Sequence, residues 1–180
     1  MIMKDLRSSV WLYRIGFVAI AVALLFFKML PLGSVAGDWP GPDLMLCLML
    51  AWVTQRPDHL PMGLIAVVVL AEDMILMRPP GLWTALVVLA TEFLRARSAL
   101  TRELGFAAEW LLISGVMIAM LLAYRLIFAI AFMTQPGFGF AFAQTVGSVL
   151  MYPVIVWLLR VVLHLRKPAA GEVDAMGRRL

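Results

Sequence analysis

The run FAAEWLLISGVMIAMLLAYRLIFAIAFM, residues 106–133, decides the class of fold. Its charged residues are Glu109 near the start and Arg125 in the second half. A helix that crosses the roughly 30 Å hydrocarbon core of a bilayer needs about 20 apolar residues, and this run supplies them. A membrane β-barrel would instead show strands of about ten residues with alternating polarity. The run is apolar on every face and therefore predicts a transmembrane helix.

The composition of the whole chain indicates that hydrocarbon surrounds most of it. Of the 180 residues, 63% are hydrophobic and 14% are charged, and the mean hydropathy is +0.96. Soluble domains are about 45–50% apolar and about 25% charged. The net charge is +4, but the basic residues flank apolar runs and lack the aromatic interleaving of single-strand nucleic-acid binders. We therefore expect a protein of the lipid bilayer with no nucleic-acid partner.

Six apolar segments follow one another, which predicts an all-α integral membrane protein with a six-helix transmembrane bundle. The segments are residues 15–32, 42–54, 60–77, 81–94, 106–133 and 138–165. The first, third, fifth and sixth reach or nearly reach the length of a span. The second and fourth are short, so four full spans with two partial ones is the alternative count.

The distribution of lysine and arginine predicts that both ends of the chain lie in the cytoplasm. With six crossings and the N-terminus inside, twelve of the 15 Lys and Arg residues fall on the inner side and only Arg78 on the outer side. Cytoplasmic loops carry such an excess. We expect a cytoplasmic or interfacial segment at residues 1–14, a transmembrane domain at 15–165 and a disordered cytoplasmic tail at 166–180.

Charged side chains inside the apolar segments are the main candidates for a functional site. Lys28, Asp43, Glu72, Asp73 and Arg125 all map to the outer half of the predicted bundle. Charged groups at this depth are costly, usually face the bundle interior and tend to pair. We expect Arg125, together with Lys28, to neutralise Asp73 and Asp43. The network either fixes the order of the helices, binds a partner, or forms a proton or solute pathway.

Two further acidic residues lie at the inner ends of segments. Glu92 precedes Arg95 and Arg97, and Glu109 opens the fifth segment. Long side chains at such positions can extend to the membrane interface. We interpret Glu92 and its neighbouring arginines as an ion pair in contact with water, and we expect Glu109 to reach the interface as well.

Small residues recur at i, i+4 spacing on the last two segments. The two faces consist of Gly115, Ala119 and Ala123, and of Gly139, Ala143 and Gly147. Small faces let helices pack closely in lipid. Packing within the bundle is the simpler interpretation, and a docking groove for a foreign helix is the alternative.

The sequence carries none of the common catalytic or cofactor motifs. There is no GxSxG, HExxH or CxxC, no phosphate loop and no dinucleotide fingerprint. The single cysteine, Cys47, lies in an apolar run and supplies too few ligands for a metal. We therefore expect no catalytic residue, no cofactor and no metal.

Two runs of the sequence resemble the rod shape-determining MreD family. They are GPDL at residues 41–44, and RPPGLW at residues 78–83 with TEFLR at residues 91–95. With the size and layout, the resemblance covers most of the chain, from about residue 11 to residue 166. It implies a non-enzymatic, multi-pass inner-membrane subunit of the bacterial cell-elongation complex. It also implies a fold similar to that of the substrate-binding subunits of energy-coupling-factor transporters.

The resemblance also implies partners, and two alternatives stand beside it. The implied partners are MreC, whose single membrane helix must dock on the protein, the MreB cytoskeleton, and RodA with its transpeptidase. Asp43 and residues 78–95 match the family motifs and are candidates for assembly. A solute-binding subunit of a transporter is one alternative, and it requires an outward-facing cavity of about 300 Å³ or more. A small enzyme acting on lipid is the other, and it requires carboxylates or histidines converging on an interfacial cleft.

Overall fold

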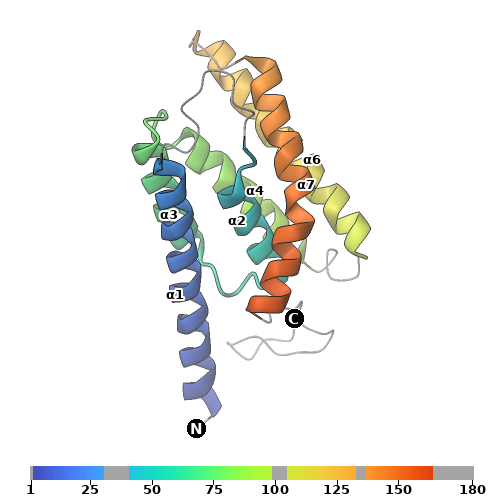
Figure 1. Cartoon of the computed structure of the whole chain (residues 1–180). Coiled ribbons are helices and arrows are strands. Elements are labelled where there is room, and N and C mark those ends of the chain that lie inside the picture. Colours follow the sequence, from blue (N-terminus) through green and yellow to red (C-terminus); the bar gives the residue numbers. More distant parts are fainter. Residues whose placement is uncertain (1, 31–40, 99–104, 133–136, 164–180) are drawn as a thin grey trace.

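The computed structural model describes residues 2–30, 41–98, 105–132 and 137–163, and these residues form six helices and no strand (Figure 1). In chain order the helices are α1 (Ile2–Met29), α2 (Leu44–Gln55), α3 (Met62–Ile75), α4 (Leu82–Ala96), α6 (Phe106–Ile130) and α7 (Phe138–Val162). The expected all-α class is confirmed for these residues. The tail predicted at residues 166–180 lies outside them.

Three of the helices are long and apolar enough to cross a membrane. They are Val10–Met29 within α1, Phe106–Ile130 and Phe138–Val162. The other three, α2, α3 and α4, hold 12, 14 and 15 residues, which makes them about 18 to 22 Å long. The third segment was expected to span alone and is shorter than predicted. Its helix starts only after Pro61 and ends before Met77, where the backbone turns with φ of 51°.

Helix α1 is continuous from Ile2 to Met29. Residues 2–14, which belong to the predicted cytoplasmic or interfacial segment, form the first part of this helix. Residues 2–15 contain neither proline nor glycine, so nothing in them interrupts the helical hydrogen bonds.

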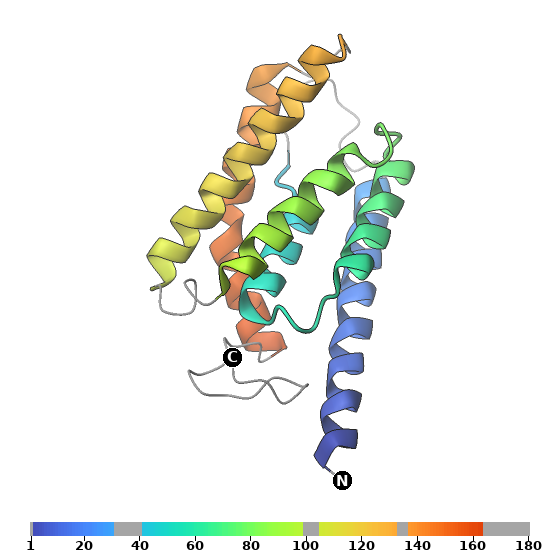
Figure 2. The same ribbon diagram turned by 180° about the vertical axis from the view of Figure 1, so that it is seen from behind.

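Successive helices run in opposite directions through the bundle (Figures 1 and 2). Helices α1, α3 and α6 end, and α2, α4 and α7 begin, at the end of the bundle drawn uppermost in Figure 1, which we call the upper end. The start of α1 and the end of α7 both lie toward the opposite, lower end, where α1 extends beyond α7.

The core of the bundle is built around α2, whose residues from Met45 to Gln55 are all buried. This helix packs chiefly against α7, and also against α4 and α1. Its Trp52 is fully buried and meets Phe17 of α1 edge to face, with ring centroids 5.4 Å apart. A helix that is apolar all round belongs in the interior. Because α2 is enclosed, its two ends meet polar groups of the protein instead of lipid.

The long helices expose large apolar side chains along their outer faces. Leu111 of α6 is 73% exposed, and Trp11 of α1 and Trp157 of α7 are 61% and 60% exposed. Soluble monomers rarely show contiguous apolar surfaces of this kind. The surface therefore suits hydrocarbon as its surroundings, in agreement with the composition.

Candidate functional site

At the upper end, Lys28 bridges two carboxylates from different helices. Its Nζ lies 3.0 Å from Asp43 Oδ1 and 2.6 Å from Glu72 Oε1. Lys28 sits in the last turn of α1, Asp43 precedes α2 and Glu72 lies near the end of α3. We call these three residues the Lys28 cluster. It joins three helices by charge-assisted hydrogen bonds, which are shorter and stronger than neutral ones.

Asp43 also organises the start of α2. Its Oδ1 accepts a hydrogen bond from the backbone N–H of Leu46 at 3.2 Å, which is the usual role of an aspartate that caps a helix. Its own backbone N–H donates to Ser148 Oγ of α7 at 2.7 Å. The buried start of α2 is thus held by α1 on one side and by α7 on the other.

The pairing expected from the sequence was right for Lys28 with Asp43 and wrong for Asp73. Asp73 Oδ2 accepts hydrogen bonds from the backbone N–H groups of Gly81 and Thr84, at 3.3 and 3.2 Å, and from Thr84 Oγ1 at 2.8 Å. The first N–H groups of a helix lack intrahelical partners, and the tight turn after α3 brings those of α4 onto this carboxylate. Lys28 bonds Glu72 instead, which the sequence did not single out as its partner.

Arg125 does not form the ion pair expected with Asp73 or Asp43. Among the described residues, the ion pairs are those of Lys28 and that of Glu92 with Arg95. The Arg125 guanidinium lies over the ring of Phe138, 5.1 Å from its centroid. A cation over an aromatic face is stabilised by the ring quadrupole.

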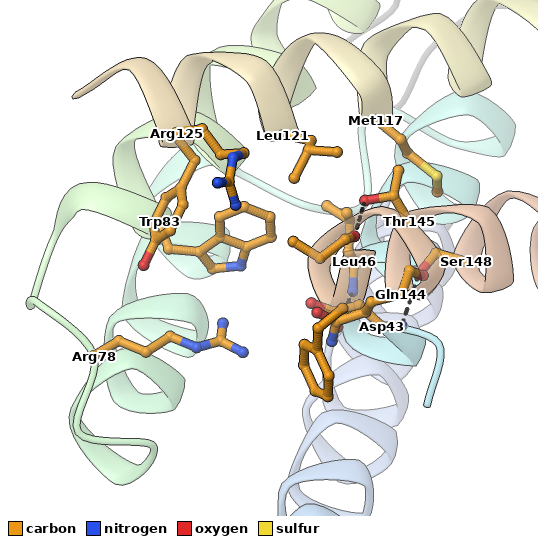
Figure 3. A pocket seen from close by; sticks show the side chains of 13 residues that line it. Asp43, Leu46, Arg78, Trp83, Met117, Leu121, Arg125, Gln144, Thr145 and Ser148 are labelled. Carbon is orange, nitrogen blue, oxygen red and sulfur yellow. Dashed lines mark hydrogen bonds between the residues drawn. The ribbon is translucent and has the colours of Figure 1, made fainter. Parts of the chain in front are cut away.

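A cavity of about 360 Å³ opens at the upper end, between α2, α4, α6 and α7 (Figure 3). Arg78 and Arg125 extend into it from opposite sides, and the Trp83 indole lies between them. The lining residues are Asp43, Leu46, Arg78, Trp83, Met117, Leu121, Tyr124, Arg125, Phe140, Ala141, Gln144, Thr145 and Ser148. This volume lies near the lower limit of the range typical of ligand sites, about 300–1,000 Å³.

The chemistry of the lining is cationic and aromatic. Among the described residues, it contains two arginines and one carboxylate, Asp43, and no histidine or cysteine. Within the described part of the chain, no group of three or more His, Cys, Asp or Glu side chains is placed to hold a metal. An enzyme acting on lipid would need several acids or histidines that converge on one cleft. Among the described residues that line this cavity there is one such group, Asp43, and it is bonded by Lys28.

The two runs of sequence that resemble the MreD family meet at this cavity. Asp43 belongs to the run at residues 41–44, and Arg78 and Trp83 belong to the run at residues 78–83. All three side chains line the same space. The sequence placed Asp43 and Arg78 on the same side of the membrane, but it did not show that their side chains line one cavity, because the two runs are separated by α2 and α3.

At the lower end, Glu109 belongs to a buried polar group that the sequence missed. Tyr152 Oη donates to Glu109 Oε1 at 2.9 Å, and Gln55 Nε2 donates to the same oxygen at 3.5 Å. Thr54 Oγ1 lies 3.2 Å from Tyr152 Oη. Glu109 has no exposed surface, so the expectation that it reaches the interface was wrong. The polar residues Thr54 and Gln55 at the end of the otherwise apolar α2 could have indicated a buried polar group there.

Glu92 forms the expected ion pair with Arg95. Glu92 Oε1 lies 2.7 Å from Arg95 Nη1, and their side chains are 39% and 26% exposed. Arg95 Nη2 also donates to the carbonyl oxygen of Leu60 at 2.5 Å. Arg95 therefore links the end of α4 to the loop before α3. The partly exposed ion pair itself contributes little stability.

The small residues predicted to pack within the bundle do so only in part. A Cβ on Gly147 would lie 3.7 Å from Pro42, so this glycine allows α7 to approach the start of α2. Gly115, Ala119 and Gly139 are exposed instead. The buried face of α6 contains Ile113 and Met117, and Gly115 lies two positions from each and so points to the other side. Packing inside the bundle was therefore wrong for the Gly115 face.

The remaining members of the two faces occupy intermediate positions. Ala123 and Ala143 are half-buried. A Cβ added to Gly115 or Gly139 would meet no atom within 4 Å. The small face on α6 thus opens outward, which leaves the alternative of a foreign helix available there.

The loop between α2 and α3 is held at the lower end by α1. The His59 ring stacks on Tyr13, with centroids 4.7 Å apart, and Arg14 Nε donates to the His59 carbonyl oxygen at 3.0 Å. Burial, together with the neighbouring charges of Arg56 and Arg14, lowers the pKa of His59 to about 4. His59 is therefore a neutral packing residue of this loop at pH 7.

Comparison with known proteins finds no match to this chain among family models, curated proteins or solved structures.

Proposed function

We propose that this protein is a multi-pass protein of the bacterial inner membrane and a non-enzymatic scaffold of the cell-elongation complex, of the MreD type. The observation that supports this most is the meeting of the two family-like runs at one cavity, through Asp43, Arg78 and Trp83.

The proposed topology has six crossings with both ends in the cytoplasm. The alternating helix directions support it, because they bring the start of α1 and the end of α7 to the same end of the bundle. Arg78 and Arg125 lie at the upper end, but the lower end holds more of the described arginines, namely Arg14, Arg56, Arg95, Arg97 and Arg160. Such an excess marks the cytoplasmic face.

The proposed mechanism is lateral binding of partner helices, above all the membrane helix of MreC. Lipid tails are as apolar as leucine, so close packing and polar contacts must drive association in a bilayer. The exposed Gly115 and Ala119 on α6 provide a surface where a second backbone could approach closely. The lower-end loops would contact MreB, and RodA with its transpeptidase would join through the same assembly.

The test is gentle purification from the native membrane, followed by identification of the proteins that accompany this one in stoichiometric amount. We expect an MreC-like subunit and the polymerase, and we expect depletion of the protein to turn rod-shaped cells into spheres. The double variant Gly115→Leu, Ala119→Leu should lose the MreC-like subunit. Val67→Leu, on the exposed face of α3, is the matched control and should retain it. Cells that keep their rod shape without the protein would contradict the proposal.

The cavity favours a second candidate, a solute-binding subunit of a transporter. Its volume of about 360 Å³ meets the size that such a function requires. The same purification separates the two candidates, because a transporter subunit would bring an ATPase module with it.

A further inference from the structure

We propose that α7 is hinged at Pro153 and that Trp110 of α6 is the latch that holds the hinge in its bent conformation. The hinge lets residues 154–162, at the lower end of the bundle, change their tilt while the part of α7 above them stays packed. The latch is a hydrogen bond from Trp110 to the backbone carbonyl of Val149. The inference does not depend on the proposed scaffold role.

The first step is the backbone donor that α7 lacks. Pro153 lies inside this helix. Proline has no backbone N–H, so the carbonyl oxygen of Val149, four residues earlier, loses its usual helical hydrogen bond, and the proline ring presses against that carbonyl. Figures 1 and 2 show that α7 changes direction partway along its length, as a helix does at an internal proline. The two parts of α7 are joined by one hydrogen bond fewer than in a regular helix, which makes bending easier at this point.

The second step is the donor that takes the place of the missing one. Trp110 Nε1 donates to the Val149 carbonyl oxygen at 2.9 Å, a normal length for this type of bond. Within a bilayer a freed backbone carbonyl needs a partner, and a neighbouring helix can supply it. The bond requires the carbonyl to tilt out of α7 towards α6, and this tilt accompanies the bend. Trp110 therefore stabilises the bent form of α7 relative to the straight form.

The third step is that polar contacts fix α7 above the hinge. The backbone N–H of Asp43 donates to Ser148 Oγ at 2.7 Å, and Cys47 Sγ donates to the Ser148 carbonyl oxygen at 3.3 Å. Just above the hinge, Tyr152 Oη donates to Glu109 Oε1 at 2.9 Å. Breaking a buried hydrogen bond leaves polar groups without partners. This part of α7 therefore keeps its position against α2 and α6.

The fourth step is that the contacts below the hinge are of a different kind. Val156 and Leu159 are buried, and the Arg160 guanidinium lies 5.7 Å from the centroid of the Phe106 ring. Within the described part of the chain, no side chain of residues 154–162 forms a hydrogen bond or an ion pair. Apolar contacts are non-directional, so this segment can shift against its neighbours at a lower cost than the part above. Motion of α7 therefore concentrates below the hinge.

The first experiment is a double-mutant cycle on the full chain, unfolded in mixed micelles and followed by circular dichroism. In Pro153→Ala the new N–H at position 153 bonds the Val149 carbonyl, so the indole donor becomes redundant. Trp110→Phe should lower the folding equilibrium constant about tenfold more in the wild-type chain than in Pro153→Ala. The cost of the smaller ring is common to both backgrounds and cancels. Trp157→Phe, at an exposed site on α7, is the matched control and should cost the same in both.

The second experiment measures the pivot as a distribution of distances between two spin labels. One label is placed at Leu89→Cys on α4, and the other at Val161→Cys below the hinge, where the native side chains are 66% and 53% exposed. The control pair joins the same α4 site to Val146→Cys, which is 40% exposed and lies above the hinge. The native Cys47 has no exposed surface and is not labelled.

Trp110→Phe should broaden or shift the distribution of the lower pair and leave that of the upper pair unchanged. Adding Pro153→Ala should remove the effect, because the restored helical bond makes α7 continuous. Should Trp110→Phe fail to fold, Pro153→Ala alone must shift or narrow the distribution of the lower pair without changing the upper pair.

Three results would overturn the proposal. An equal cost of Trp110→Phe with and without Pro153→Ala would show that the indole does not replace the missing donor. Equal broadening of both label pairs would indicate general loosening of the bundle instead of a hinge. A lower pair that is unchanged by Trp110→Phe, or by Pro153→Ala where that variant stands alone, would show that α7 has no pivot at this point.

Discussion

Replacing Lys28 by methionine should destabilise the bundle more than any other single change at its surface. The substitution keeps an unbranched apolar stem and removes the ammonium that bonds Asp43 at 3.0 Å and Glu72 at 2.6 Å. Those carboxylates are 7% and 1% exposed and cannot turn to water. Removing one partner of a buried ion pair costs about 3–5 kcal/mol. Lys28 is 23% exposed, so we expect about 3 kcal/mol, the lower limit of that range.

The assay is unfolding of the purified protein in mixed micelles with increasing dodecyl sulfate, followed by circular dichroism. Phe27→Met is the matched control, because this neighbour on α1 is 60% exposed and should change stability by less than about 0.5 kcal/mol. The triple variant Lys28→Met, Asp43→Asn, Glu72→Gln leaves no buried charge in the cluster and should recover most of the loss. A loss below about 1 kcal/mol for Lys28→Met, as for a solvated pair, would refute the reasoning. So would a triple variant no more stable than the single one.

Three further predictions concern the lower end and the turns. Tyr152→Phe should destabilise the protein by about 1–3 kcal/mol, because Glu109 loses a buried hydrogen bond, and the same micelle assay measures this. Gly81→Ala should cost about 1–2 kcal/mol, since Gly81 has φ of 92°, whereas Gly105→Ala, at φ of −62°, should be nearly neutral. Stability should fall as the pH drops from about 7 towards 5, because the unfolded chain protonates His59 near its ordinary pKa of about 6.5 while the folded chain does so only near 4. Thermal unfolding of His59→Gln should show a weaker dependence over that interval, and an equal slope in both proteins would exclude His59 as the cause.

The helical class and the position of the main charged groups could be predicted from the sequence. Long hydrophobic runs predict helices well, because a segment inside the bilayer must satisfy its backbone hydrogen bonds internally. The depth of Lys28, Asp43 and Glu72 followed from counting residues, and buried charges must find partners. Lys28 with Asp43 was therefore predictable as a pair.

The actual partners of the remaining charges depend on turns that hydropathy does not describe. Asp73 bonds the start of α4 because the chain reverses within a few residues after Ile75. That reversal gives Asp73 Oδ2 its hydrogen-bond partners within the turn and the start of α4, so the pairing with Arg125 that hydropathy suggested does not form. The buried group around Glu109 could not be predicted for a related reason. Tyr152 comes from a distant part of the chain, and only the packing of α6 against α7 brings it to Glu109.

The unequal lengths of the helices give the bundle two sides of different height. Helices α6 and α7 hold 25 residues each, or about 37 Å, while α3 and α4 reach only about 21 and 22 Å. Against a hydrocarbon core of roughly 30 Å, the side formed by α3 and α4 falls about 8 Å short. In the proposed six-span topology the bilayer thins beside this side, at a cost of a fraction of a kcal/mol for each ångström. A neighbouring protein with equally short helices would share that deformation, so membrane elasticity alone would draw the two together along this side.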